Sequence, residues 1–260
     1  MKKFTKISMI LVGIFAAVGL ICLIGSFALG LTFGTFAEMV SDGKFSFGIG
    51  NMSLGFGNHG FGFGVVSTDS EEQEVSADKC ENLEIELGAG SLELVYDDVD
   101  KIEIRQNGVS GFKSKMDGDT LKIEGGLKVG INSNGGTITL TIPKGMRFDE
   151  VDLEVGAGEA YIEKLTSNLL DVEVGAGEAN IRDLDTVTLN AGVGAGKLYM
   201  ELVGSENDYN YDVECGIGEI LIGDNSYGGL GKNQSVSNTG AKRMLDVECG
   251  IGEVEISFIK

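Results

Sequence analysis

The sequence contains no tryptophan, one proline and one histidine among its 260 residues. The histidine, His59, lies in a glycine- and phenylalanine-rich stretch that offers it no partners for a metal site. Basic residues are also scarce, since 20 Lys and Arg stand against 40 Asp and Glu and give a net charge of -20. This charge argues against nucleic acids and anionic surfaces as partners and is compatible with a basic partner.

The scarcity of histidine also bears on catalysis. No histidine lies in the part of the chain that we expect to fold, and no Ser, Cys or Lys lies in a nucleophile motif. Polysaccharide lyases and hydrolases built on β-helices need acidic or Arg clusters in a groove, whereas the acidic residues here recur in regular columns. We therefore expect a protein that is not an enzyme, with no catalytic residues and no cofactor.

Glycine, by contrast, is abundant, with 41 residues, and it marks a recurring phrase. Five copies read LEVGAGEAYIE, VEVGAGEANIR, AGVGAGKLYME, VECGIGEILIG and VECGIGEVEIS, and a degenerate copy, IELGAGSLELV, precedes them. From position 156 onward, the first glycines of successive copies are 19, 19, 22 and 34 residues apart. Because self-similarity at about 20 residues is typical of stacked coils, we predict an all-β fold, a parallel β-solenoid of about 20 residues per rung.

Each phrase is expected to form a strand, a corner and a second strand. Apolar and acidic residues alternate before the glycines, as in a strand with one buried face, and the alternation resumes out of phase after them. Glycine suits the corner because it reaches positive φ without a Cβ penalty, and we expect the middle Ala or Ile to point inward. The predicted structural corner glycines are Gly88, Gly90, Gly156, Gly158, Gly175, Gly177, Gly194, Gly196, Gly216, Gly218, Gly250 and Gly252.

The chain divides into segments by composition. Residues 1–6 are basic, residues 7–33 carry no charged side chain, and residues 34–79 form a Gly- and Phe-rich and then acidic linker. The uncharged run is long enough to span a bilayer, which predicts a transmembrane helix over 7–33, with a cleaved signal peptide as the rival interpretation. The solenoid should cover 80–260, with irregular first coils or a capping sheet over 80–147, regular rungs over 148–260 and a loop excursion at 223–242.

The same segments predict a location. Lys2, Lys3 and Lys6 precede the apolar run, so the positive-inside rule keeps the N-terminus cytoplasmic and places the solenoid outside the cell. The predicted localisation is the cell membrane, single-pass, with residues 7–33 contacting the lipid bilayer. Cys22 is expected to be a buried apolar residue of this span.

Three outward columns of the predicted solenoid are acidic, and like charges at rung spacing repel each other. Cation binding is conceivable, because Ca²⁺ favours several carboxylate oxygens. We nevertheless expect a solvated acidic face without a metal, since the repeats lack the GGxGxD sequence of calcium-binding β-rolls and the third regular rung interrupts every column. The weak metal candidates are Glu159, Glu178, Glu219 and Glu253.

The two cysteines of the last phrases, Cys215 and Cys249, fall in one inward column of the predicted core. Neighbouring rungs would bring them close enough for a disulfide. In-register parallel strands, however, hold two Cβ atoms about 4.8 Å apart instead of the roughly 3.8 Å that a disulfide prefers. We therefore expect reduced core cysteines.

The stretch TITLTIPKGMRFDEVDLEVGAGEAYIEKL and the repeats after it resemble a bacterial β-strand-repeat family named "putative adhesin", an envelope domain of unknown function that is common in Gram-positive bacteria. The resemblance covers about residues 80–260. It implies a parallel β-solenoid exposed at the envelope and, in some members, an association with envelope-stress regulation. It offers no catalytic residues to carry over.

From these observations we expect a membrane-anchored, extracellular β-solenoid that acts as a non-catalytic structural, adhesion or protein-interaction module. The alternatives are an envelope-stress regulatory or sensing component and, as a minor one, a calcium-binding β-solenoid.

The final phrase runs its second strand almost to Lys260, which leaves no residues to cap the last rung. This C-terminal rung is expected to pair with an envelope protein or a second copy, unless the 223–242 excursion folds over it.

Overall fold

The computed structural model of the chain describes residues 46–49, 52–55, 71–126, 136–229 and 231–260. The chain divides into two units, Met1–Val65 and Val66–Lys260. In the first unit, β1 (Ser46–Ile49) and β2 (Met52–Gly55) form an antiparallel hairpin. The second unit contains nineteen strands, β3 to β21, together with two single-turn 3₁₀ helices, Ala77–Lys79 and Glu206–Asp208.

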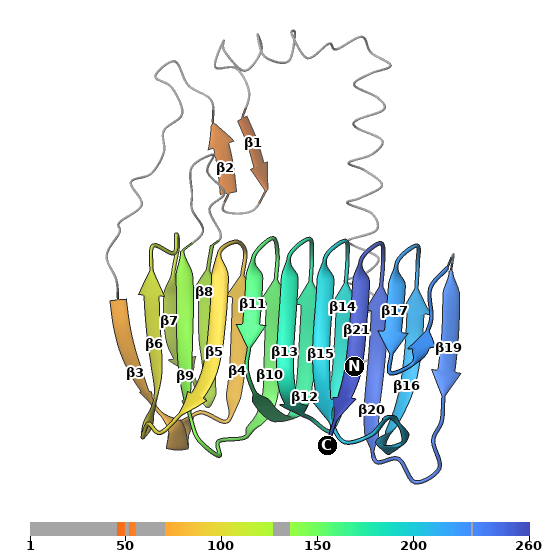
Figure 1. Cartoon of the computed structure of the whole chain (residues 1–260). Coiled ribbons are helices and arrows are strands. Elements are labelled where there is room, and N and C mark those ends of the chain that lie inside the picture. The colour runs from red at the N-terminus through yellow and green to blue at the C-terminus, as the bar shows by residue number, and fades with distance from the viewer. Residues whose placement is uncertain (1–45, 50–51, 56–70, 127–135, 230) are drawn as a thin grey trace, which may run out of the picture. The chain divides into compact units, whose positions relative to one another are not determined.

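The glycine corners divide the strands of the second unit into two sheets. The strands before each corner form the pre-glycine sheet, whose lateral order is β7 (Lys113–Asp117), β8 (Thr120–Gly125), β4 (Asn82–Leu87), β10 (Phe148–Val155), β12 (Leu165–Val174), β14 (Thr188–Val193), β20 (Arg243–Cys249), β16 (Tyr209–Cys215) and β19 (Lys232–Val236). The strands after each corner form the post-glycine sheet, whose order is β3 (Glu71–Ser76), β6 (Lys101–Asn107), β9 (Thr137–Pro143), β5 (Ser91–Asp97), β11 (Glu159–Ile162), β13 (Glu178–Asp185), β15 (Lys197–Val203), β21 (Glu253–Ile259), β17 (Glu219–Ile222) and β18 (Asn225–Ser226). Figure 1 shows this order along the unit.

The predicted fold class, a parallel β-solenoid preceded by one transmembrane helix, is wrong, although the described elements are indeed β-rich. Parallel pairing joins the repeats, but antiparallel strands close both ends, with β7 on β8 and β6 on β9 at one end and β19 on β16 and β18 on β17 at the other. The repeats also do not stack in chain order, because β20 and β21 lie between β14–β15 and β16–β17. The result is a curled, half-barrel-like sheet folded at the glycine corners (Figure 1).

This error has a physical cause. Hydrophobic period fixes which residues of a strand face the core, but each repeat presents nearly the same inward ladder to its neighbours. Period alone therefore does not fix which repeat lies beside which.

The predicted uncapped last rung is corrected as well, because β21 pairs with β15 on one side and with β17 on the other. The 223–242 excursion instead supplies β18 and β19, which cover β17 and β16.

The predicted membrane anchor also requires correction. Residues 7–33 lie outside the described residues, and within the described ranges no helix is long and apolar enough to cross a bilayer. The structure thus does not support the single-pass, cell-membrane localisation. His59 and Cys22 also lie outside the described residues.

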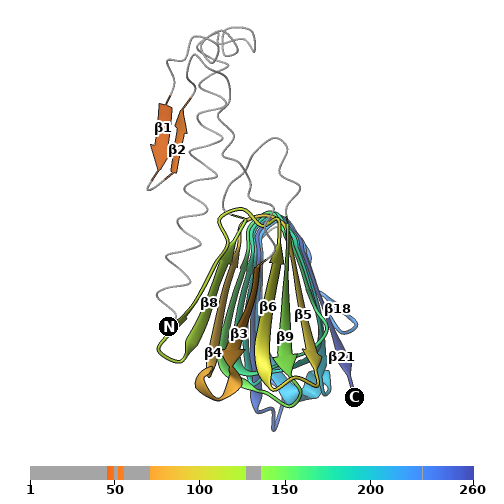
Figure 2. The ribbon, with the colours of Figure 1, turned by 90° about the vertical axis from the view of Figure 1, so that its left-hand side faces the viewer.

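The core fills the wedge between the two sheets, which meet at the glycine corners and diverge toward the opposite edge (Figure 2). The corner region buries small residues such as Val174 and Ala179 but also Leu92 and Leu198, whereas the wide edge buries Phe148 and Tyr209 completely. Buried apolar side chains thus fill the wedge from the corners to the wide edge.

Close backbone contact explains the corner glycines better than positive φ does. Of the twelve predicted corner glycines, only Gly90 has a positive φ. A Cβ on Gly177 would instead lie 2.2 Å from the carbonyl oxygen of Gly158 in the neighbouring corner, and the same kind of clash recurs along the stack. The middle residues point outward rather than inward as predicted, since Ile217 and Ile251 are 67% and 69% exposed.

This contact generates a test with a matched pair of glycines. Gly177→Ala should destabilise the fold by about 2 kcal/mol or more, because the new methyl group overlaps backbone that cannot move alone. Gly192→Ala should be neutral or slightly stabilising, since the nearest atom to a Cβ there is a side-chain carbon of Glu173 at 3.8 Å. Urea unfolding of both variants measures the difference, and equal losses would contradict the close-contact explanation.

Candidate functional site

The acidic columns predicted from the repeats lie in register on the outer face of the pre-glycine sheet. Along one column Glu84, Asp152, Asp171, Asn190, Asp246 and Asp212 are successive neighbours. Along the other, Glu86, Glu154, Glu173, Gly192, Glu248 and Glu214 follow one another. The structure therefore brings the predicted members together, with the last two of each column in exchanged order.

The pKa values of three carboxylates in the middle of these columns, Asp152, Asp171 and Glu173, are raised, which favours their neutral form. Desolvation between neighbouring strands, followed by the charges of Asp171 and Glu84, raises the pKa of Asp152 to about 6. Desolvation also raises the pKa of Glu173, to which the charge of Asp171 adds. This face consequently carries less negative charge near pH 6 than its composition suggests.

The third acidic column lies on the outer face of the post-glycine sheet and contains all four weak metal candidates. Glu159 and Glu178 are neighbours, Lys197 follows, and Glu253 and Glu219 complete the column. Lys197 divides the candidates and pairs with Glu253 at 3.1 Å. Among the described residues, no group of three or more His, Cys, Asp or Glu side chains is arranged to hold a metal ion.

A groove lies on the same outer face, over β9, β5, β11 and β13. Its volume is about 420 Å³, and it is lined by two adjacent rows of outward residues together with the inward Leu92 and Ala160. One row contains Thr137, Ser91, Glu159 and Glu178, and the other contains Glu93, Tyr161 and Asn180. The groove therefore combines one aromatic ring, three carboxylates, an amide and two hydroxyl groups.

The aromatic ring in this groove already attracts a cation. Tyr161 is 39% exposed, and the guanidinium carbon of Arg182 lies 5.7 Å from its ring centroid. Arg182 lies within the register shift between β13 and β15, where Asp183 adopts a positive φ of 40°. Such irregularities change the direction of nearby side chains, and aspartate tolerates this conformation better than most residues. The bulge thus lies next to the groove and its ring.

The two core cysteines are adjacent, buried and free. Cys215 and Cys249 are register partners in β16 and β20, and neither forms a disulfide. Burial raises the pKa of both thiols, that of Cys249 to about 11. Because the reactive form of cysteine is the thiolate, these side chains behave as core residues.

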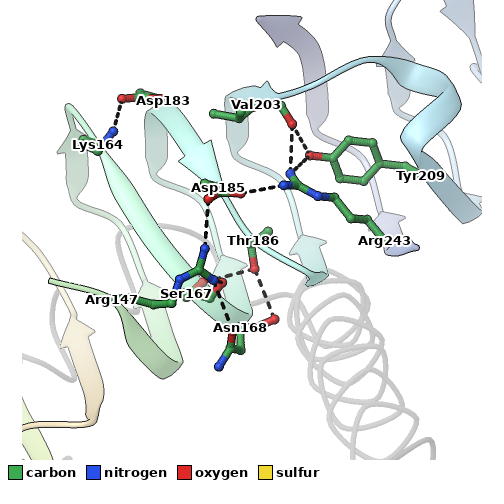
Figure 3. Close-up of polar contacts among 10 residues, drawn as sticks. All are labelled: Arg147, Lys164, Ser167, Asn168, Asp183, Asp185, Thr186, Val203, Tyr209 and Arg243. Carbon is green, nitrogen blue, oxygen red and sulfur yellow. Dashed lines mark hydrogen bonds and ion pairs between the residues drawn. The ribbon is translucent and has the colours of Figure 1, made fainter. Parts of the chain in front are cut away.

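A polar network that sequence reasoning missed joins the strands at the wide edge (Figure 3). Asp185 lies between two arginines and accepts hydrogen bonds from Arg147 at 2.9 Å and from Arg243 at 2.7 Å. Arg243 also donates to the Val203 carbonyl at 2.9 Å and to the Tyr209 hydroxyl at 2.7 Å. These bonds connect residues that start or end different repeats, so the network holds the wide edge together where glycine corners do not.

Of the groove residues, the sequence pattern indicated Glu159 and Glu178 as members of an acidic column but not the uncharged residues beside them. The available signal was Tyr161, an aromatic residue at an outward position between the inward Ala160 and Ile162. The partner residue Asn180 occupies the same outward position in the next repeat. An aromatic and an amide at matched outward positions indicate a contact surface more directly than repeated acids do.

Comparisons with known proteins identify the fold. No family model and no curated protein matches the chain. A crystal structure described as a "putative cell adhesion protein" from Clostridium sporogenes is similar over 74% of this chain and 99% of its own, with 17% identity and a TM-score of 0.53. A "putative adhesin" from Bacteroides fragilis matches 74% of this chain and 98% of its own, with 12% identity and a TM-score of 0.33. A "putative lipid binding protein" from Parabacteroides distasonis matches 74% and 96%, with 12% identity and a TM-score of 0.26.

The resemblance to "putative adhesin" proteins is confirmed, since the Clostridium structure is described as a "putative cell adhesion protein". At 17% identity, the likeness to the Clostridium structure shows a shared fold alone. The other two similarities fall below a TM-score of 0.5 and carry no argument about this chain.

The acidic face generates a prediction about pH. The folded-state pKa of Asp152, about 6, lies above its ordinary value of 3.8, so this group favours the folded state below pH 3.8 and loses that contribution as pH rises to 6. Asp152→Asn should therefore stabilise the protein relative to wild type at pH 7 and not at pH 3.5, by at most about 1 kcal/mol because solvent screens the group. Thermal melts of both proteins across this range measure the effect, and a constant difference would contradict it.

Proposed function

We propose that the chain is a non-catalytic, adhesion-type binding protein and that the groove around Tyr161 receives a basic segment of a partner protein. The single observation that carries this proposal is the groove itself, in which an exposed ring lies beside three carboxylates. Its volume of about 420 Å³ is in the range of small-ligand pockets and suits one or two long side chains.

The chemistry of the groove supports a cationic group. A Lys or Arg side chain pairs with carboxylates and stacks its charge on an aromatic face, and the contact of Arg182 with the Tyr161 ring is an internal example. Glu159 and Glu178 are register neighbours, so both lie within reach of one bound side chain. Two carboxylates and a ring are a better match for an ammonium or guanidinium group than for an anion or a purely apolar ligand.

Long-range charge supports the same partner. A net charge of -20 accelerates the approach of basic molecules and repels acidic ones. Steering of this kind raises the association rate for any basic partner, whereas the groove provides the local contacts that slow dissociation. Steering and local contacts can be separated experimentally, because salt screens the long-range steering more strongly than the contacts within the groove.

A labelled octalysine peptide tests the proposal by fluorescence anisotropy. Glu178→Lys should weaken binding by about tenfold or more, because it places a cation where the ligand's charge would lie. Glu214→Lys makes the same charge change on the outer face of the other sheet and should weaken binding by less than about twofold. Tyr161→Phe should retain binding, whereas Tyr161→Ala should lose about threefold or more.

The comparison of the two lysine variants decides the outcome. Equal weakening by Glu178→Lys and Glu214→Lys would mean that the peptide responds to overall charge and that the groove is not the site. Absence of any binding of the peptide to the wild-type protein at low salt would also contradict the proposal. Circular dichroism spectra of the variants confirm that each remains folded.

A further inference from the structure

The C-terminal strand pair (β20 and β21, residues 243–259) occupies a slot between two other repeats. β20 pairs with β14 over six residues and with β16 over seven, while β21 pairs with β15 over seven residues and with β17 over four. Chain order would place β16–β17 in this slot, because that repeat follows β15 directly. The slot is thus filled by a segment that arrives later in the chain.

The two repeats that compete for the slot share a heptapeptide. Residues 213–219 and 247–253 both read VECGIGE. Val213 and Val247 are both buried, as are Cys215 and Cys249, so β14 would meet the same inward side chains from either repeat. On the other sheet Glu219 and Glu253 are register partners, and Lys197 forms an ion pair with Glu253 at 3.1 Å. Glu219 would occupy the position of Glu253 if β17 filled the slot. The edge of β14–β15 therefore does not distinguish the repeats by this heptapeptide.

Contacts outside the heptapeptide select the C-terminal pair. β21 continues beyond the shared residues to pair Phe258 with Leu202, and Gly204 donates a backbone hydrogen bond to the Ile259 carbonyl at 2.7 Å. β17 ends at Ile222 and is followed by a glycine turn, so it has no counterpart to these contacts. At the start of β20, Arg243 bonds Asp185 and the Val203 carbonyl, whereas its register partner in β16 is Tyr209. The longer strand and the arginine make the C-terminal pair the preferred occupant.

A short hinge connects the C-terminal pair to the rest of the molecule. Residues 237–242 run from β19 to β20, and these two strands lie on opposite sides of β16. The hinge must therefore span two strand spacings, about 10 Å. Asn238 holds it in place through hydrogen bonds to the Tyr209 carbonyl at 2.8 Å and the Asn210 side chain at 2.8 Å, and Gly240 has a φ of +90°.

We propose that this slot is a strand-exchange site, at which the chain's own C-terminal pair is replaced by the C-terminal pair of a second copy. Reciprocal exchange leaves every strand paired and changes only the hinge, because the same residues meet in the same register. The shared heptapeptide assists the opened state, since β16–β17 can cover the edge of β14–β15 while the C-terminal pair is displaced. The exchanged dimer would carry two grooves and bind a multivalent partner with higher avidity.

Capture of a synthetic peptide tests the slot directly. The full chain is incubated a few degrees below its thermal midpoint with a fluorescein-labelled peptide of residues 243–260, cooled, and separated from free peptide by gel filtration. The wild-type peptide should be retained at least about tenfold more than the same peptide with Val254→Pro, because proline removes a hydrogen-bond donor from the ladder. No retention, or equal retention of the two peptides, would overturn the proposal.

The hinge provides the second measurement. Deletion of residues 237–241 leaves one hinge residue, which spans at most about 7 Å, so the hinge cannot cross the end of β16 and the chain should shift to an exchanged dimer, as short hinges do. Insertion of Gly-Ser-Gly after Thr239 is the matched control and should leave the protein monomeric. Light scattering at several protein concentrations distinguishes the exchanged dimer from the monomer. A folded, strictly monomeric deletion variant would contradict exchange between copies, and if that variant does not fold, peptide capture decides alone.

Discussion

Each repeat depends on a backbone contact that only glycine permits. At the corners the chains of neighbouring repeats approach so closely that a Cβ would lie within 2.2 to 2.9 Å of a carbonyl oxygen at Gly177, Gly196 and Gly194. The hydrogen-bond ladder consequently continues through the corner, as between the Ala176 amide and the Gly156 carbonyl at 2.7 Å. Because the ladder is continuous, the two sheets are joined along their whole shared edge, and the inward rows of the repeats stay in register on both faces.

Sequence reasoning predicted the local structure well and the assembly less well. Alternation correctly assigned Val174 and Ile181 to the core and Glu173 to the surface, since period 2 is a property of one strand alone. Lateral order depends on comparing nearly identical repeats, and the contacts that settle it come from Phe258 and Arg243, which lie outside the repeated phrase. A capping sheet was an open alternative for residues 80–147, but the antiparallel pairing of the end strands could not be predicted, because strands such as β7 and β19 carry no glycine phrase.

The candidate site shows the same difference between features that the repeat predicts and features that depend on individual residues. The acidic rows follow from the repeat itself, so their register could be predicted from spacing. The groove arises where the repeat is broken by individual residues, with Ser91 short, Tyr161 aromatic and Asn180 uncharged at matched positions. A periodic scaffold supplies a uniform surface, and departures from the period give that surface local chemistry. Searching outward rows for unlike residues is therefore more informative about binding than searching them for repeated ones.

The capped ends of the fold determine where such a protein can lengthen. At both ends the chain turns back on itself, and antiparallel strands cover the outermost repeats. Only in the middle, from β10 to β15, does chain order coincide with lateral order, and there the phrases are 19 residues apart. A tandem duplication of 19 residues in this stretch would add one repeat without disturbing either cap. Additional repeats can therefore be inserted in the interior of the fold, while the antiparallel strands at both ends stay unchanged.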